Sequence, residues 1–129
     1  MDVGDCPDAP AGLSWSRMRI LYKILPEAEW RKAVGAGRFE GSAVDHRDGF
    51  IHLSAAHQLP GTAEKHFAGQ SGLLLVGFPE DDLTQLRWEP SRGGDLFPHV
   101  YGAIPTRLVC RVQALELDRG MLRLPGDIT

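Results

Sequence analysis

The stretch "DGFIHLSAAHQ" (residues 48–58) places a histidine between apolar residues and follows it with a serine. It predicts a strand over 50–54 and a helix over 55–68. His52 alternates with its apolar neighbours, so its side chain points to the opposite face of the strand. Ser54 shares that face, where a half-buried strand usually carries apolar side chains. Two interpretations follow: His52 is a structural residue, or it lies in a site beside the helix amides, which favour anions.

The chain before this stretch predicts one strand and one helix. "RILYKI" (19–24) alternates and is rich in β-forming residues, so we expect a strand there. The segment 26–37 predicts a helix in which Pro26 takes the first helical position and Gly35 or Gly37 provides the left-handed end. Apolar residues at helical spacing are expected to lie in the core: Trp30, Ala33 and Val34.

The helix predicted over 55–68 is interrupted by Pro60 and Gly61. Two helical pieces are therefore expected, with Ser54 capping the first and Thr62 capping the second. The apolar stripe of this segment is predicted to consist of Ala56, Leu59, Ala63 and Phe67.

Strands dominate the rest of the chain. Residues 38–49 are rich in Gly, Ser and Asp and predict a connector. The apolar run at 72–78 predicts a central buried strand. A short strand is expected to end at Trp88, with a loop over 88–102 and a last strand over 107–117. The apolar side of that last strand is expected to carry Leu108, Cys110, Val112 and Ala114. The sequence thus predicts an α+β fold, with mainly antiparallel sheets and two or three helices.

Length and composition limit the function classes. The 129 residues predict a single α+β domain over 18–129, preceded by a flexible extension over 1–17. A formal charge of −3 argues against a nucleic-acid partner, and no apolar run approaches the ~18 residues of a membrane span. Cys6 and Cys110 match neither a disulfide framework nor a metal spacing. We expect a cytoplasmic protein, either a monomer or a weak homodimer.

The stretch "WEPSRGGDLFPHVYG" (88–102) concentrates groups that could do chemistry. A guanidinium at Arg92 can bind phosphate or carboxylate in a bidentate manner. Glu89 and His99 offer acid–base capacity near neutral pH. In the alternative interpretation, Arg92 pairs with Glu89 or Asp95 and only fixes the course of a long loop.

Several common sites are excluded by spacing. The five histidines (46, 52, 57, 66 and 99) form neither HExxH nor a zinc-finger pattern, so no metal is expected. The Gly93–Gly94 pair lacks a Walker lysine, and GxGxxG does not occur, which argues against a P-loop or Rossmann nucleotide site.

The blocks "LYKI", "DGFIHLS" and "LRWEPSRGGDLFPHVYG" resemble the small bacterial family called domain of unknown function 952, over about residues 19–117. Ala55 departs from the threonine expected after "HLS", and residues 1–17 have no counterpart. The resemblance implies an ADP-ribosyltransferase-like fold, with two antiparallel sheets around a cleft that holds NAD in the enzymes. The segment "GFIHLSAAHQ…TAEKHF" also resembles RNA 2′-phosphotransferases, which share that fold.

The resemblance implies a nucleotide-like ligand, with NAD as the cofactor to be expected. Arg92 and Lys23 would contact phosphate, and His52 and Ser54 would position the ribose or nicotinamide. The transferases carry a glutamate at the start of a late strand. The candidate here is Glu89, which lies one strand earlier in the chain. A non-catalytic binding domain and an unrelated acid–base enzyme that uses Glu89 and His99 are therefore the alternatives. The expected catalytic residues are His52, Glu89, Arg92 and His99, and the expected ligand-binding residues are Tyr22, Lys23, Ser54, Asp95 and Tyr101.

Overall fold

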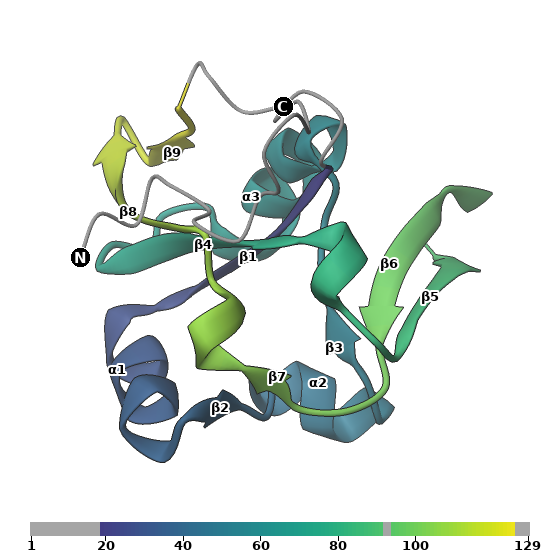
Figure 1. Cartoon of the computed structure of the whole chain (residues 1–129). Helices are drawn as coiled ribbons and strands as arrows, with labels where there is room; N and C mark the ends of the chain where they lie inside the picture. The colour runs from purple at the N-terminus through teal and green to yellow at the C-terminus, as the bar shows by residue number, and fades with distance from the viewer. Residues whose placement is uncertain (1–18, 92–93, 126–129) are drawn as a thin grey trace, which may run out of the picture.

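The computed structural model describes residues 19–91 and 94–125. The predicted N-terminal extension (1–17) and Arg92 lie outside the described residues. Four antiparallel strands form one sheet in the order β1 (Ile20–Pro26), β4 (Leu73–Pro79), β8 (Arg111–Asp118) and β9 (Met121–Arg123) (Figure 1). Every residue of β4 is buried, as the apolar run predicts for a strand that is covered on both faces.

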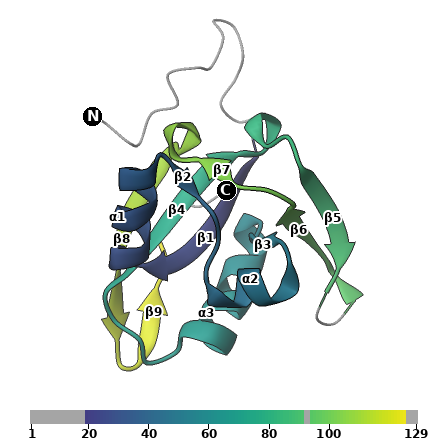
Figure 2. The same ribbon diagram turned by 90° about the horizontal axis from the view of Figure 1, so that it is seen from below.

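A second antiparallel sheet has the order β3 (Ile51–His52), β6 (Leu96–Val100), β5 (Leu86–Pro90). Strands β5 and β6 form an arm beside the four-stranded sheet (Figures 1 and 2). A backbone bridge between Tyr22 of β1 and Ser54 joins the segment after β3 to the first sheet. The two sheets thus meet at these two residues.

The prediction of a loop over 88–102 was wrong. Residues Leu86–Pro90 and Leu96–Val100 pair as a hairpin, in which Trp88 lies opposite Pro98. The many Gly, Pro and charged residues suggested irregular structure, whereas Arg87 and Glu89 lie together on one face of the hairpin and Pro98 is buried on the other. The side chains on the other face provide the apolar contacts, and Val100 belongs to the core.

The segment predicted as a connector (38–49) is also regular. It contains β2 (Arg38–Phe39), which pairs with β7 (Ile104–Pro105), and helix α2 (Ala43–Asp48). The side chain of Asp45 accepts a hydrogen bond from the Ser42 amide at 2.8 Å, which supports the start of α2. Gly49, with φ of 88°, ends it in the left-handed conformation.

Helix α1 (Glu27–Ala36) follows β1 directly. Pro26 precedes the helix instead of occupying its first position, and Gly37 ends it with φ of 82°, as predicted. Trp30 and Ala33 are buried, but Val34 is 53% exposed, so its assignment to the core was wrong. The buried face of this ten-residue helix includes Trp30 and Ala33 but not Val34, although the apolar spacing grouped the three residues together.

The predicted helix over 55–68 is two pieces, a 3₁₀ turn (Ala56–Gln58) and α3 (Leu59–Phe67). The division lies before Pro60, which is part of the first turn of α3, so Thr62 lies inside the helix and does not cap it. The Ser54 hydroxyl contacts the Thr62 hydroxyl at 3.0 Å. The Ala55 amide donates a hydrogen bond to Oε1 of the Gln58 side chain at 3.0 Å.

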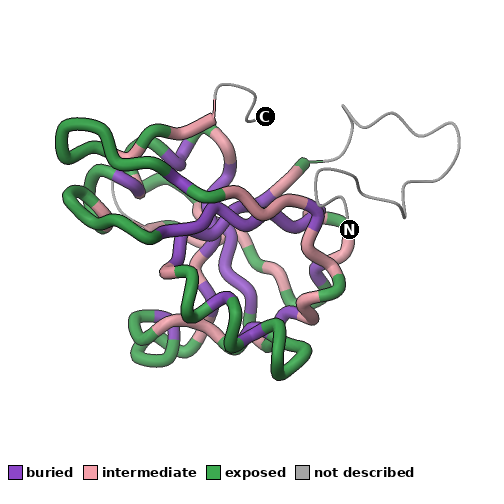
Figure 3. Tube along the Cα trace, turned by 90° about the vertical axis from the view of Figure 1, so that its left-hand side faces the viewer, coloured by how far each residue is buried: buried purple, intermediate pink, exposed green. Residues whose placement is uncertain are grey.

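Two further 3₁₀ turns, Glu80–Asp82 and Thr106–Leu108, lead into β5 and β8. Strand β8 begins later than predicted, and the predicted alternation fails toward its end, where Ala114 is exposed and Leu115 is buried. Buried residues run through the middle of the molecule (Figure 3), and exposed residues gather at the turns.

The α+β class is confirmed, with antiparallel sheets and three α-helices among the described residues. The finer likeness to ADP-ribosyltransferases stays a prediction. None of the helices in the described segments has the length and apolar character needed to cross a membrane.

Candidate functional site

The three-stranded sheet brings the two polar stretches of the sequence together. His52 on β3 lies opposite His99 on β6, and His99 lies opposite Arg87 on β5. Directly paired residues project to the same face of an antiparallel sheet. The alternate residues Ile51 and Val100 belong to the core on the other face. We call the face that carries the two histidines the site face and define it by Phe50, His52, Arg87, Glu89, His99 and Tyr101.

Asp45 anchors one side of this face from α2. Its carboxylate accepts hydrogen bonds from the Lys23 ammonium, at 2.9 and 3.1 Å, and from the His52 ring at 2.6 Å. Burial raises the pKa of Asp45, but hydrogen bonds from His52 and Ser42 and the charge of Lys23 outweigh it, lowering the pKa from 3.8 to about 2. A buried, ionised Asp45 therefore fixes the orientation of the His52 imidazole.

The other ring nitrogen of His52 also faces a carboxylate. Its Nε2 lies 3.0 Å from Oδ2 of Asp48, which is 33% exposed. A hydrogen bond from Arg47 lowers the pKa of Asp48, and the proximity of His52 lowers it too. Both ring nitrogens of His52 thus face carboxylates of α2, which hold the ring in place.

His99 forms the second histidine–carboxylate pair. Its Nδ1 lies 2.8 Å from Oε1 of Glu89, and the Tyr101 hydroxyl donates to the same oxygen at 2.6 Å. The hydrogen bond from Tyr101, followed by that from His99, lowers the pKa of Glu89, and the bond to Glu89 raises the pKa of Tyr101. His99 is 4% exposed, and its Nε2 is buried without a hydrogen-bond partner among the described residues.

Phe50 lies between these groups. Its ring stacks on His99 at 4.1 Å and contacts His52 at 4.6 Å and Tyr101 at 5.2 Å, measured between ring centroids. The two imidazoles themselves are 5.3 Å apart in an edge-to-face arrangement. The predicted meeting of the two stretches is thus observed for His52 and for Glu89, His99 and Tyr101.

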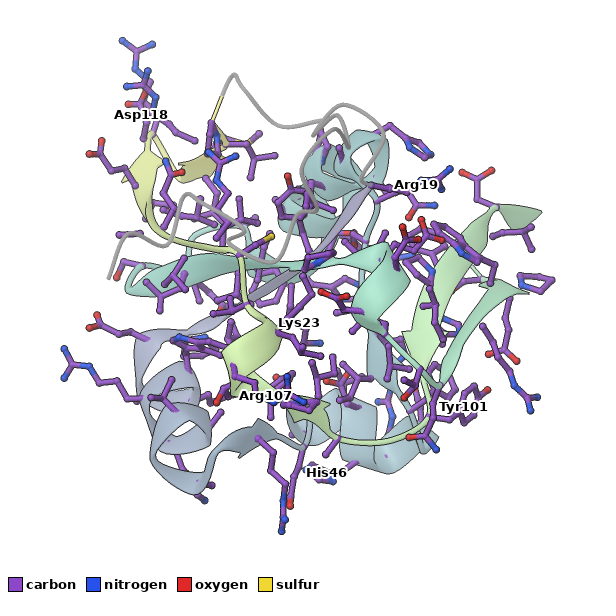
Figure 4. The ribbon with its side chains drawn as sticks, viewed as in Figure 1. Arg19, Lys23, His46, Tyr101, Arg107 and Asp118 are labelled. Atoms are coloured by element: carbon purple, nitrogen blue, oxygen red, sulfur yellow. The ribbon has the colours of Figure 1, made fainter. Side chains whose placement is uncertain are left out.

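Other predicted site residues lie elsewhere. Lys23 is 7% exposed, lies near the centre of the molecule (Figure 4) and also donates to the His52 carbonyl at 3.1 Å. Its ammonium thus binds protein groups, and its expected contact with phosphate stays a prediction. Tyr22 and Ser54 are buried at 1% and 5% exposure. Asp95 is exposed in the turn between β5 and β6, and Arg92 lies outside the described residues.

The sequence interpretation missed Asp45, Asp48, Phe50 and Arg87. Arg87 is exposed, and its guanidinium carbon lies 5.3 Å from the centre of the Tyr101 ring. Figure 4 shows Tyr101 at the β5–β6 side of the molecule. Alternation along "LRWEP" gives the only early signal for Arg87, because it places residues 87 and 89 on one face. No sequence signal marks Asp45 and Asp48, because residues 38–49 predict a connector.

Two further features of the described residues bear on ligands. No group of three or more His, Cys, Asp or Glu residues within them is arranged to hold a metal ion. A hollow is lined by Leu83, Gln85, Ile104, Arg107 and their neighbours, but by none of the predicted site residues. The cleft expected between the sheets stays a prediction.

The chain is similar to solved structures of one protein, CC0527 from Caulobacter crescentus. Its crystal structure is 50% identical in sequence with a TM-score of 0.79, covering 81% of this chain and 94% of that one. Its solution NMR structure is 49% identical with a TM-score of 0.74, covering 84% and 94%. No curated protein matches. The family model described as "Protein of unknown function (DUF952)" matches residues 24–112, and the chain therefore belongs to this family.

Proposed function

We propose that the site face binds a nucleotide-like ligand, with NAD as the first candidate. The observation that carries this proposal is the convergence of two histidine–carboxylate pairs, His52 with Asp45 and His99 with Glu89, around the ring of Phe50. Such pairs, on a rigid sheet and with perturbed carboxylate pKa values, are typical of functional sites.

The aromatic side chains support a planar ligand. Phe50 is partly exposed, and Tyr101 is 36% exposed. Stacking of a base on an aromatic side chain contributes about 1–3 kcal/mol per base. A nicotinamide or adenine ring therefore has a platform here, and the ionised carboxylates of Asp48 and Glu89 offer hydrogen-bond acceptors to sugar hydroxyls.

Transferase-like chemistry is the finer part of the proposal. In group transfer from NAD, positive charge builds up on the ribose as the bond to nicotinamide breaks. A preorganised carboxylate stabilises that charge electrostatically. Glu89 fits this role because its lowered pKa keeps it ionised, and His99 and Tyr101 hold one of its oxygens in place.

Two alternatives each have support in the site. Oε1 of Glu89 is already occupied by two hydrogen bonds, which suits a binding domain without catalysis. The hydrogen bond between Glu89 and His99 also suits general acid–base catalysis on another small molecule, in which the carboxylate orients the imidazole. Turnover of NAD would indicate NAD chemistry, turnover of another small molecule would indicate the acid–base enzyme, and no turnover would indicate the binding domain.

A titration tests the proposal. NAD, ADP-ribose and nicotinamide are added separately to the ¹⁵N-labelled protein, and amide shifts on β3 and β6 are followed. Phe50→Leu keeps an apolar side chain but removes the stacking ring, and Phe67→Leu on α3 is the matched control. We expect binding to weaken in the first variant and to persist in the second. Absence of any shift at millimolar NAD or ADP-ribose would refute the proposal, and release of nicotinamide on prolonged incubation would establish catalysis.

A further inference from the structure

We propose that the hollow beside β7 is a second binding site, which takes a small α-amino acid with an aliphatic side chain. We call it the β7 hollow; it is lined by residues 82–85, 100, 103–105, 107 and 108. Its volume is about 170 Å³, below the about 300–1,000 Å³ of pockets for drug-sized ligands, so it suits a smaller molecule than a nucleotide. None of the residues that define the site face lines it, and the proposal therefore goes beyond the proposed function.

Backbone hydrogen bonds fix both walls of the β7 hollow. One wall runs from Asp82 to Gln85, and the Gln85 carbonyl accepts a hydrogen bond from the Tyr101 amide at 2.9 Å. The other wall is β7 with the turn Thr106–Leu108, whose first amide donates to the Gly37 carbonyl at 3.2 Å. A site whose walls are already in place loses little conformational freedom when a ligand binds, which favours affinity.

The deep part of the β7 hollow is apolar. It is lined by Leu83, Val100 and Ile104, which are buried members of the core, and by the half-buried Leu108, which packs against that core. An aliphatic side chain placed against these residues is removed from water, and this removal favours binding. The apolar lining therefore selects a ligand that carries such a side chain.

Two opposite charges line the same hollow. Asp82 and Arg107 form no ion pair within 4.0 Å with each other or with any other residue of 19–91 and 94–125. Figure 4 shows Arg107 beside β7. A guanidinium can bind a carboxylate through two parallel hydrogen bonds, and an ionised carboxylate accepts hydrogen bonds from an ammonium group.

This pair of charges indicates a zwitterion. The remaining polar side chains of the lining, Thr84 and Gln85, are neutral and exposed, so the charges of the lining cancel. A ligand with a single charge would face one attractive and one repulsive group. An α-amino acid carries its carboxylate and its ammonium on one carbon, so it can contact Arg107 and Asp82 together while its side chain lies in the apolar part.

Ligands that each lack one group test the proposal. L-Valine, isovalerate (without the ammonium), isobutylamine (without the carboxylate) and glycine (without the side chain) are titrated separately into the ¹⁵N-labelled protein, and the amide shifts around the β7 hollow are followed. Loss of a charge-assisted hydrogen bond corresponds to about tenfold weaker binding or more. We expect valine to bind at least about tenfold more tightly than each analogue. Equal binding of isovalerate or isobutylamine, or no shift at these amides up to the solubility limit of valine, would overturn the proposal.

Two variants assign the charged contacts, and Arg123→Gln, at an exposed position on β9, is the matched control. Arg107→Gln should weaken the binding of valine and isovalerate but not that of isobutylamine. Asp82→Asn should weaken the binding of valine and isobutylamine but not that of isovalerate. Valine binding that is unchanged in both variants, or weakened equally in Arg123→Gln, would overturn the assignment. No outcome depends on NAD, so the proposed function of the site face stands or fails separately.

Discussion

Replacing Asp45 by asparagine tests the internal support of the site face. Asp45 has 1% of its side chain exposed and accepts hydrogen bonds from Ser42, Lys23 and His52. The substitution leaves the Lys23 ammonium buried without its counter-charge. Breaking a buried ion pair in this way costs about 3–5 kcal/mol. We expect Asp45→Asn to lower the free energy of unfolding by that amount at neutral pH.

The pH dependence gives a second measurement of the same interaction. The folded-state pKa of Asp45 is lowered from 3.8 to about 2, which corresponds to about 2 kcal/mol of stability at neutral pH. Because the folded pKa is depressed, this contribution is fully present above pH ~4 and is lost as the pH falls through about 2. Between pH 6 and pH 2.5, more than half of this contribution to the difference between wild type and Asp45→Asn should disappear.

Urea unfolding, followed by circular dichroism at both pH values, measures these differences. Asp118→Asn on the exposed end of β8 is the matched control, for which a change within about 0.5 kcal/mol is expected. If Asp45→Asn does not fold, Lys23→Met and the double variant Lys23→Met/Asp45→Asn complete the test, because the double variant should regain stability by removing the unpaired charge. A cost for Asp45→Asn below about 1 kcal/mol that is independent of pH would refute the reasoning.

Three further outcomes follow from the structure. Glu89→Gln should lower the pKa of Tyr101, because the hydrogen bond to the carboxylate raises it; ultraviolet absorbance against pH measures this, and an unchanged titration would contradict the contact. Gly77→Ala should destabilise by about 1–3 kcal/mol, since its Cβ would lie 2.8 Å from a methyl carbon of Ile20. In helix α1, the Cβ of Gly35→Ala would meet no atom within 4 Å, so this variant should stabilise the protein by about 0.4–1 kcal/mol. Thermal unfolding compares the two glycine variants, and the opposite order of stability would show the packing argument to be wrong.

Local signals in the sequence were enough for several elements. The apolar run at 72–78 and the alternating run at 19–24 predicted the paired strands β4 and β1, and Gly37 was among the predicted ends of α1. The alternation around His52 predicted its direction away from the core. In each case the decisive information lies within a few neighbouring residues.

The elements that the sequence interpretation missed depend on distant contacts. The hairpin of β5 and β6 depends on pairing between two strands that carry Pro90 and Pro98, and α2 is a six-residue helix, too short to show a clear apolar period. Asp45 is read in the sequence as one polar residue in a connector. In the structure it is a buried carboxylate between Lys23, 22 residues earlier, and His52.

The sequence by itself determined the α+β class, the central strand and the types of side chain available to a site, because composition and periodicity are local properties. Only the tertiary structure decided which of these side chains meet: it buried Lys23 against Asp45, placed Arg87 beside His99 and left Nε2 of His99 without a partner among the described residues. The physical reason is that strand register and buried charge pairing are set by the whole packed core, which no short stretch of the chain encodes.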